Sequence, residues 1–447
     1  MTSIKQLAIR GTFWTVAGYG ASYIIRFCSN IVLTRLLAPE VFGLMGLVYV
    51  FITGMHMFSD IGIHTSVLQN KRGGERTFQK TAWTLQVMRS VVLWAGCCLI
   101  AFPIAHFYGN SQLLFLLPAV GVTTFVSGFY STSLYNLGRG MEVKKIAQFD
   151  LLGQIVGVVT TISVAYFYPT VWALVIGSVI SSIVQMLWSH RLAIANKQPD
   201  GFLLDRDSMR EIVSFGKWIF ISTILTFFAT QSDRLMLGKL LPLEVLGVYG
   251  IAFTLADIPK QVVMAIGSKV VFPTYTKLVD LPRLEFRSKI KKLRRLILVG
   301  AVVGLALMIS FGDIVISILY DNRYQDAAWM LPIIAIGLWP IMLSSTLEGA
   351  LYALGNPRFV VLGNFFSFVF MASGIWLGFQ IWGVPGAVMA VAASNIPPYL
   401  CSLYGLSREG LACIRQDIQA TLSLVGLVLL LVYGRYLVGL PLTLPNF

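Results

Sequence analysis

The stretch that decides the fold is Arg35-Leu36-Leu37-Ala38-Pro39-Glu40-Val41-Phe42-Gly43-Leu44, and it has a second version at Lys239-Leu240-Leu241-Pro242-Leu243-Glu244-Val245-Leu246-Gly247-Val248. Each version holds a basic residue, a Leu pair, a Pro, a Glu and a Gly, and lies between two long apolar runs. A short polar turn flanked by about 20 apolar residues on each side is typical of a link between two membrane-spanning helices. Because the turn recurs, the sequence predicts two copies of one helical bundle.

The composition indicates a polytopic membrane protein. Of the 447 residues, 56% are hydrophobic and only 12% are charged, whereas soluble domains carry about 25% charged residues. The net charge of +14 could suit nucleic acid, but the basic residues lie in short loops between apolar runs, where they orient a membrane protein. We therefore expect no nucleic-acid partner. The Cys and His residues show no metal-ligand or CxxC spacing, so no metal or other cofactor is expected.

Hydropathy divides the chain into apolar runs long enough to cross a membrane. The predicted spans are 11–37, 41–69, 81–107, 112–137, 146–168, 171–193, 212–241, 245–275, 296–319, 327–354, 359–382, 384–406 and 418–440. The predicted domains are an N-terminal six-helix bundle at 1–200, a C-terminal six-helix bundle at 201–410 and an additional transmembrane helix at 411–447. No cleavable signal is expected, because the first apolar run is too long and no small-residue cleavage site follows it.

The fold class that follows is an all-α polytopic membrane protein with a parallel internal repeat. Each predicted bundle has an even number of spans, so both copies enter the membrane from the same side. Most of the 34 Lys and Arg residues fall in the N-terminal lead and in alternate loops, above all in the basic loop 277–295. The opposite loops hold only Arg35, Lys239, Arg323 and Arg435. This bias predicts that the N-terminus is cytoplasmic.

Charged residues inside the predicted spans are the candidate functional residues, because each costs about 2.5–3.5 kcal/mol at the middle of a membrane helix. The candidates for binding an anionic head group are Arg26, Arg89, Arg234 and Lys260. The candidates for proton or ion coupling are Asp60, Asp257 and Glu348. Structural pairing is the alternative for each, and Asp257 and Lys260, three apart on one helix face, could pair or line a cavity together. Arg26 favours ligand binding, since an Arg deep in an apolar helix needs a water-filled cavity or an anion. Arg also suits phosphate through its planar fork of donors.

The sequence argues against an enzyme. It has no GxxxxGK[ST] phosphate loop, no HExxH and no GxSxG motif. It also has no long outer loop that could hold a polymerase or ligase site. Direct ATP hydrolysis and catalysis in a soluble domain are therefore not expected.

The order of the motifs resembles that of the Wzx-type polysaccharide flippases of the multidrug/oligosaccharidyl-lipid/polysaccharide exporter superfamily. The resemblance is carried by the turn at 35–43, by Phe58-Ser59-Asp60-Ile61-Gly62, by Asp233-Arg234-Leu235-Met236-Leu237-Gly238 and by Gly355-Asn356-Pro357. It implies movement of a polyprenyl-(pyro)phosphate-linked oligosaccharide from the inner to the outer leaflet of the cytoplasmic membrane, with Arg26 and Arg89 best matching the residues that contact the (pyro)phosphate. It also implies work beside a polysaccharide polymerase or chain-length machinery. The family usually has twelve or fourteen spans, and the odd number predicted here departs from that pattern.

Three alternatives remain open at this point. A cation-coupled multidrug exporter of the same superfamily would need an acid-rich cavity. A membrane-embedded glycosyltransferase or ligase would need a large outer loop with catalytic acids. A non-transporting scaffold of a polysaccharide synthesis complex would fail to transport in reconstituted vesicles.

Overall fold

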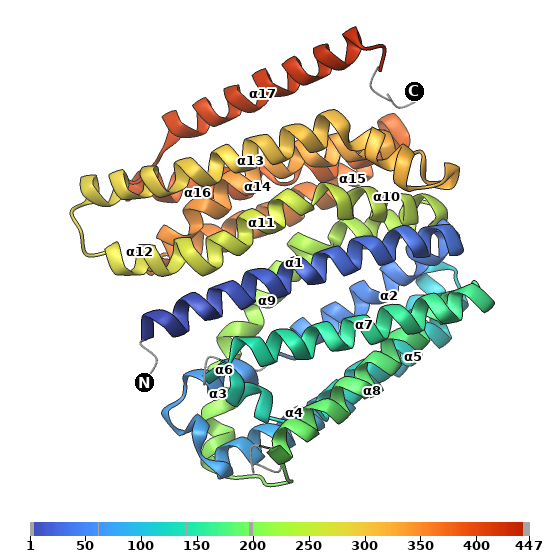
Figure 1. Ribbon diagram of the computed structural model, residues 1–447, viewed down its shortest axis with the longest axis vertical. Helices are drawn as coiled ribbons and strands as arrows, with labels where there is room; N and C mark the ends of the chain where they lie inside the picture. Colours follow the sequence, from blue (N-terminus) through green and yellow to red (C-terminus); the bar gives the residue numbers. More distant parts are fainter. Residues whose placement is uncertain (1–3, 61, 140–141, 196–199, 441–447) are drawn as a thin grey trace. The chain divides into compact units, whose positions relative to one another are not determined.

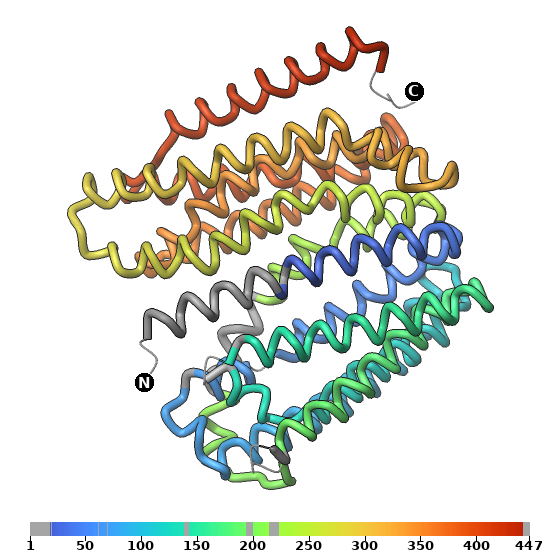
Figure 2. The backbone as a smooth tube through the Cα atoms, viewed as in Figure 1, coloured from blue at the N-terminus to red at the C-terminus, as the bar shows by residue number. Residues whose placement is uncertain are grey.

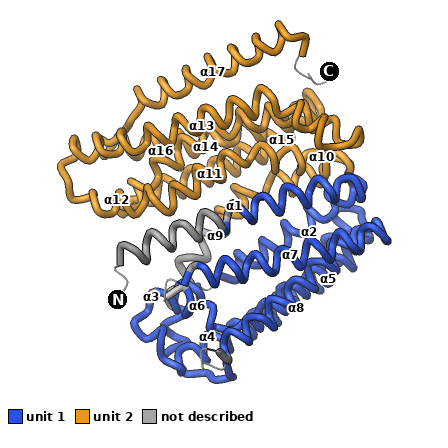
Figure 3. The backbone as a smooth tube through the Cα atoms, in the orientation of Figure 1, with its two compact units in different colours: residues 1–224 blue, residues 225–447 orange. Residues whose placement is uncertain are grey.

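The computed structural model describes residues 4–60, 62–139, 142–195 and 200–440, and within them every regular element is a helix (Figure 1). The predicted all-α class is confirmed. The chain divides into two compact units, Met1–Ile224 and Leu225–Phe447, which are coloured separately in Figure 3. The domain limits at residues 200 and 410 stay predictions, and the boundary between the two units falls inside helix α9 (Arg206–Leu240).

The first unit holds the helices up to the middle of α9. They are α1 (Ile4–Leu36), α2 (Pro39–Phe58), α3 (Ile63–Gln69), the 3-10 helix η1 (Lys71–Gly74), α4 (Arg76–Tyr108), α5 (Gln112–Gly128), α6 (Ser133–Arg139), α7 (Val143–Phe167) and α8 (Val171–Ala195). Helix α4 packs on α5, α7 on α8, and α1 on α7. Small and polar side chains hold α1 against α7: Gly18 lies against Ala147, and Ser22 donates to Gln154 Oε1 at 2.6 Å.

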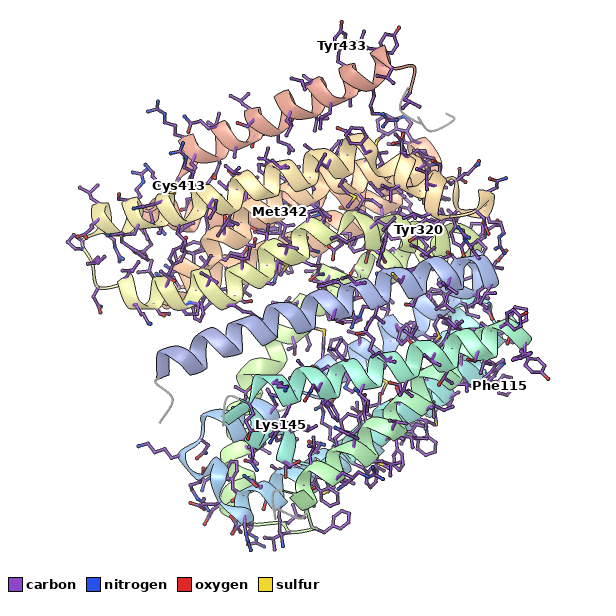
Figure 4. All side chains as sticks on the ribbon, viewed as in Figure 1. Phe115, Lys145, Tyr320, Met342, Cys413 and Tyr433 are labelled. Carbon is purple, nitrogen blue, oxygen red and sulfur yellow. The ribbon has the colours of Figure 1, made fainter. Side chains whose placement is uncertain are left out.

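The second unit holds the remaining helices, and its chain path can be followed in Figure 2. They are α10 (Leu243–Ala256), α11 (Ile258–Ile266), the π-helical turn η2 (Gly267–Val271), α12 (Phe272–Leu278), α13 (Arg283–Leu319), the 3-10 helix η3 (Asn322–Tyr324), α14 (Ala327–Ala353), α15 (Arg358–Ala393), α16 (Ile396–Arg408) and α17 (Ile414–Leu437). Helix α14 is the core of this unit, because it contacts α10, α13, α15 and α16 and buries most of its side chains. Met342, labelled in Figure 4, is fully buried in it.

Both copies of the quoted turn join two helices, as predicted. Helix α1 ends at Leu36 and α2 begins at Pro39, while α9 ends at Leu240 and α10 begins at Leu243. Proline suits the start of a helix because its fixed φ is helical and its missing N–H has no intrahelical partner there.

The long helices confirm a polytopic membrane protein. Within the described ranges, 8 helices are long and apolar enough to cross a membrane, or 9 when α10 and the bent segment after it count as one span. One of them is the stretch Arg358–Arg408, which the sequence divides into spans at 359–382 and 384–406. Gly383, with φ 62°, lies at the predicted turn, and Ser367 Oγ donates to Ser394 O at 2.8 Å across the resulting hairpin. Gly378 and Gly386 allow the two arms to touch, since a Cβ on Gly378 would lie 2.4 Å from Gly386 O.

Helix α17 lies along α13 (Figure 1), and two buried ion pairs fix its direction. Arg294 pairs with Asp417, and Arg435 donates to both carboxylate oxygens of Asp313, at 2.8 and 3.0 Å. The earlier residue of α13, Arg294, pairs with the earlier residue of α17, Asp417, and the later residues Asp313 and Arg435 pair with each other. The two helices therefore run parallel. An antiparallel helix would bring Arg294 toward Arg435, and like charges repel. Parallel running agrees with the predicted topology, in which both helices cross in the same direction.

The structure corrects the expected basic loop at 277–295. Most of this stretch is helical, because α12 continues to Leu278 and α13 begins at Arg283. Arg294 is fully buried rather than solvated. The hydropathy pattern could not reveal this, because the acidic partner of Arg294 lies far away in the sequence.

The segment 200–205 is bound along the end of the first unit. Its backbone N–H groups at Leu203 and Asp205 donate to the hydroxyls of Thr84 and Thr81 on α4, at 2.9 and 3.1 Å. Further along, the carboxylate of Glu211 accepts from Asn70 Nδ2 at 2.7 Å and from Arg72 at 2.9 Å. The hydrogen bond from Asn70, followed by that from Arg72, lowers the pKa of Glu211 below its usual 4.5.

Candidate functional site

Arg26 has an exposed side chain on α1. Among the side chains that the structure describes, none forms a hydrogen bond or ion pair with its guanidinium. Nearby Tyr23 and Ile24 are also exposed, at 39% and 65%. A guanidinium on a membrane helix that has no partner among these described side chains is available to an anion or to water.

Helix α2 breaks inside the second predicted span. The α-helix ends at Phe58, and Gly62, with φ 67°, starts the short α3. The carboxylate of Asp60 accepts the N–H of Gly62 at 2.8 Å, which closes the turn at the break. The conformation of Gly62 is one that only glycine adopts readily. Asp60 therefore has a structural role within the turn.

Arg89 on α4 binds the broken end of α2. Its Nη2 donates to His56 O at 2.9 Å, and its Nε donates to Ser59 Oγ at 2.9 Å. The last carbonyl groups of a helix have no partner within the helix, so a cation that donates to them stabilises its end. Arginine has five N–H donors, and the half-buried Arg89 keeps further donors beyond these two contacts.

Other polar side chains surround this break in the first unit. His56 Nε2 lies 2.9 Å from Thr124 Oγ1 on α5, and Tyr135 on α6 donates to Gln86 Oε1 at 2.5 Å. Gln86 in turn donates to Gly128 O at 2.9 Å. We call His56, Ser59, Asp60, Arg89 and Thr124 the α2 break cluster. It gathers two of the predicted site residues, Asp60 and Arg89, on neighbouring elements.

A second break, in the second unit, lies between α10 and α11. Helix α10 ends at Ala256, α11 begins at Ile258, and the chain bends by 44° there. Pro259 in the first turn of α11 cannot donate the N–H that would continue the helix. Asp257, which lies between the two helices, forms an ion pair with Lys260 and accepts from Gln261 Nε2 at 2.5 Å. Of the two alternatives for Asp257 and Lys260, the structure therefore shows the pair.

Arg234 lies close to the Asp257–Lys260 pair, because Arg234 and Lys260 both contact the ring of Phe253. Arg234 Cζ lies 5.6 Å and Lys260 Nζ lies 5.8 Å from the centre of the Phe253 ring, distances at which a cation is attracted to the ring face. Next to Arg234, the buried Asp233 accepts from Tyr249 OH at 2.7 Å. Arg234, Asp257 and Lys260 are thus brought together, and Phe253 and Tyr249 were missed by sequence reasoning because aromatic residues are common throughout the spans.

Glu348, the third candidate for coupling, belongs to the second unit. It lies on α14, and Ser402 Oγ on α16 approaches its Oε1 at 3.5 Å. No basic side chain forms an ion pair with it among the residues that the structure describes.

The sequence did not predict the two most deeply buried ion pairs. The side chains of Arg294 and Asp417 are 0% and 2% exposed, and those of Arg435 and Asp313 are 4% and 3% exposed. One signal was present: basic and acidic residues stand at nearly the same separation on α13 and on α17, in inverted order. Recognising it required knowing that these two helices are neighbours.

Comparison with protein families gives one match over most of the chain. A family model described as "Polysaccharide biosynthesis protein" matches residues 32–329. This range runs from the end of α1 to the start of α14 and includes both breaks. The resemblance to polysaccharide exporters that the sequence indicates is therefore confirmed.

Curated relatives at low sequence identity are also named as polysaccharide biosynthesis proteins. The lipopolysaccharide biosynthesis protein WzxC of Escherichia coli K12 is 23% identical over 278 residues, which are 62% of this chain and 56% of that protein. The succinoglycan biosynthesis transport protein ExoT of Rhizobium meliloti is 23% identical over 272 residues, 60% of this chain and 54% of that protein. The teichuronic acid biosynthesis protein TuaB of Bacillus subtilis is 22% identical over 308 residues, 68% of this chain and 60% of that protein. The chain thus matches little more than half the length of these relatives.

Solved structures extend the likeness of fold to nearly the whole chain. A lipid II flippase MurJ in an inward closed conformation superimposes with a TM-score of 0.73, covering 97% of this chain and 94% of that one at 12% identity. An inward-facing multidrug resistance MATE family transporter of the MOP superfamily superimposes with a TM-score of 0.64, covering 87% and 95% at 14% identity. At such identities the likeness concerns the fold alone.

Proposed function

Because this chain belongs to the polysaccharide biosynthesis protein family, we propose that it moves a polyprenyl-(pyro)phosphate-linked oligosaccharide from the inner to the outer leaflet of the cytoplasmic membrane. The carried sugar then enters cell-surface polysaccharide synthesis. The observation that supports this best is the family match over residues 32–329, on a fold similar to that of a lipid II flippase. The transport step is alternating access, in which a central site opens first to one side and then to the other.

The proposed anion site centres on Arg26. Its exposed guanidinium, without a described protein partner, fits the (pyro)phosphate of a carrier lipid. Arg89, in the same unit, is proposed to assist through the donors that the end of α2 leaves free. Arg234 and Lys260, in the second unit, are proposed as further anion-binding residues, and both lie near the Phe253 ring.

Proton or ion coupling is proposed for Asp60, Asp257 and Glu348. Asp60 and Asp257 stand at the breaks of α2 and α10, where a change of charge would act directly on the bend. Glu348 is supported by its lack of a described cationic partner. A coupling residue of this kind would give transport a pH dependence that its amide variant lacks.

The proposed location is the inner membrane with a cytoplasmic N-terminus. The lopsided distribution of Lys and Arg among the predicted loops supports this orientation. A polysaccharide polymerase or chain-length machinery is the proposed partner, since the flipped oligosaccharide must be joined to a growing chain on the outer side.

The decisive experiment measures flipping in vesicles that contain the purified chain and a polyprenyl-pyrophosphate oligosaccharide. An impermeant oxidant reports which leaflet holds the sugar. Arg26→Ala should abolish flipping and Arg26→Lys should retain part of it. The matched control Arg358→Ala, which removes another exposed Arg of a long helix, should leave it unchanged. Full activity of Arg26→Ala would remove this residue from the site, and inactive wild-type vesicles would refute the transport proposal.

A second candidate is a cation-coupled multidrug exporter. It is favoured by the likeness to the MATE transporter and by the buried acids Asp233 and Asp257. If the chain is a multidrug exporter, adding a drug should dissipate an ion gradient across the same vesicles, and the lipid-linked sugar should not move. A non-transporting scaffold would give neither signal while still binding the synthesis machinery.

A further inference from the structure

Helix α13 changes abruptly from basic to apolar along its exposed face. The exposed basic side chains are those of Lys289, Lys291, Lys292 and Arg295. The next exposed positions are apolar, with Leu296 80% exposed and Val299 57% exposed. At 1.5 Å of rise per residue the basic part is about 9 Å long, comparable with the headgroup layer of a bilayer leaflet, which is about 5–8 Å thick.

The first turn of α17 repeats this pattern beside α13. Arg415 is exposed there, with Ile414 and Ile418 exposed at 47% and 54%. Gln416 Nε2 donates to Lys291 O at 3.0 Å, which holds this turn at the level of the basic part of α13. Cationic and apolar side chains of two helices therefore meet at one level. Helix α17 runs from Cys413, just before its first residue, past Tyr433 near its end (Figure 4).

These cations have no acidic partners in the described part of the chain, although their neighbours do. Arg283 pairs with Glu409 at 3.1 Å, and Arg294 pairs with Asp417. Lys291 and Arg295 are four residues apart and so project on the same side of α13. The pairing of Arg294 also occupies the carboxylate of Asp417, which lies in the first turn of α17.

We propose that these residues form a binding surface for the headgroup phosphate of an anionic phospholipid from the surrounding leaflet. We call Lys289, Lys291, Lys292, Arg295 and Arg415 the α13–α17 basic surface. Clustered Lys and Arg residues immediately next to a membrane helix attract anionic lipid, and the exposed Leu296 and Ile418 provide apolar contact for acyl chains at the adjoining depth. A soluble acidic protein would match the charges but not the apolar side chains. The surface is separate from the proposed substrate residues, and it does not depend on the proposed function.

The test is lipid retention by the full-length chain, measured by native mass spectrometry in detergent. Phosphatidylglycerol, phosphatidylcholine with the same acyl chains, and inorganic phosphate are added in separate arms. The wild type should retain phosphatidylglycerol at least about tenfold better than phosphatidylcholine, and replacing all members of the surface by Gln should reduce the preference to about twofold or less. A control variant removes the same number of charges at exposed basic residues of the first unit, by Gln at Lys71, Arg76, Arg191, Arg206 and Arg210, and should keep the preference.

Three results would overturn the proposal. The first is equal retention of the two lipids by the wild type, which would leave an acidic protein as the partner. The second is an equal loss in the control variant, which would mean that general charge attracts the lipid. The third is equal occupancy by inorganic phosphate, which would mean a free-anion site. If the full Gln variant fails to fold, Arg295→Gln with Arg415→Gln should still lower the preference, and Arg295→Lys with Arg415→Lys should restore it.

Discussion

The buried pair of Arg294 and Asp417 offers the sharpest test of how this fold is held together. Arg294 uses its whole fork: Nε donates to Thr346 Oγ1 at 2.7 Å, Nη2 donates to Leu343 O at 3.0 Å, and Nη1 pairs with Asp417. Tyr399 OH donates to the second carboxylate oxygen of Asp417 at 3.0 Å. Both charged side chains are almost completely shielded from solvent.

Replacing Asp417 by Ala should therefore be strongly destabilising. Removal of one partner leaves the buried guanidinium without a counter-charge, which costs about 3–5 kcal/mol. The matched control is Glu409→Ala, which breaks the pair with Arg283. Because Arg283 is exposed and Glu409 is partly exposed, loss of this ion pair should cost about 0–1 kcal/mol. Removing both buried charges, with Arg294→Met and Asp417→Leu, should recover much of the loss because no unpaired charge remains.

The assay is thermal and denaturant unfolding of the purified chain in detergent, read by near-ultraviolet circular dichroism. A double-mutant cycle between Arg294 and Asp417 should give a large coupling energy. If Asp417→Ala costs no more than Glu409→Ala, or if the two single losses simply add, the reasoning about a shared buried charge is refuted. Cysteine labelling near the end of α17 would then report whether this helix has left α13.

Three further outcomes are expected. Arg89→Ala should loosen the end of α2 and cost about 1–3 kcal/mol, because the partly buried carbonyl of His56 loses the donor that satisfies it. Faster hydrogen exchange at residues 59 and 60 would demonstrate this, and unchanged exchange would contradict it. The pKa of Glu211 is lowered in the folded chain, so its contact with Asn70 contributes stability above pH 4.5 and should be lost as the pH falls below that value, freeing residues 200–211 for proteolysis; Glu211→Gln should remove this pH dependence. Gly378→Val should open the α15 hairpin, because its side chain would collide with Gly386, and disulfide trapping between cysteines placed on the two arms should fail in that variant but succeed in the parent.

Much of the fold was open to prediction from sequence because hydropathy acts locally. Apolar runs interrupted by short polar turns defined most of the membrane helices, including the turns at Pro39 and Pro242 and the hairpin at Gly383. The thirteenth apolar run is the helix α17, as its length indicated. These features depend on residues that are close together in the chain, so a window on the sequence contains all the information they need.

The candidate site was only partly predictable, since charge in an apolar run indicates that a residue is special without saying what it contacts. Asp60 and Asp257 carried the same signal, yet one closes a glycine turn and the other pairs with Lys260. Arg89 and Arg26 are both arginines within predicted apolar spans, yet Arg89 binds the end of α2 and Arg26 has no described partner. The difference depends on which helices are adjacent.

The sequence by itself determined the class of protein, the positions of most of its membrane helices and its membership of a polysaccharide biosynthesis family, because each follows from local composition or from residue order. Only the tertiary structure decided which charges neutralise one another. Arg294 reads as a loop residue until α17 places Asp417 beside it. The physical reason is that a charge can be buried only where an opposite charge and hydrogen-bond partners surround it, and these partners come from helices that are distant in the chain.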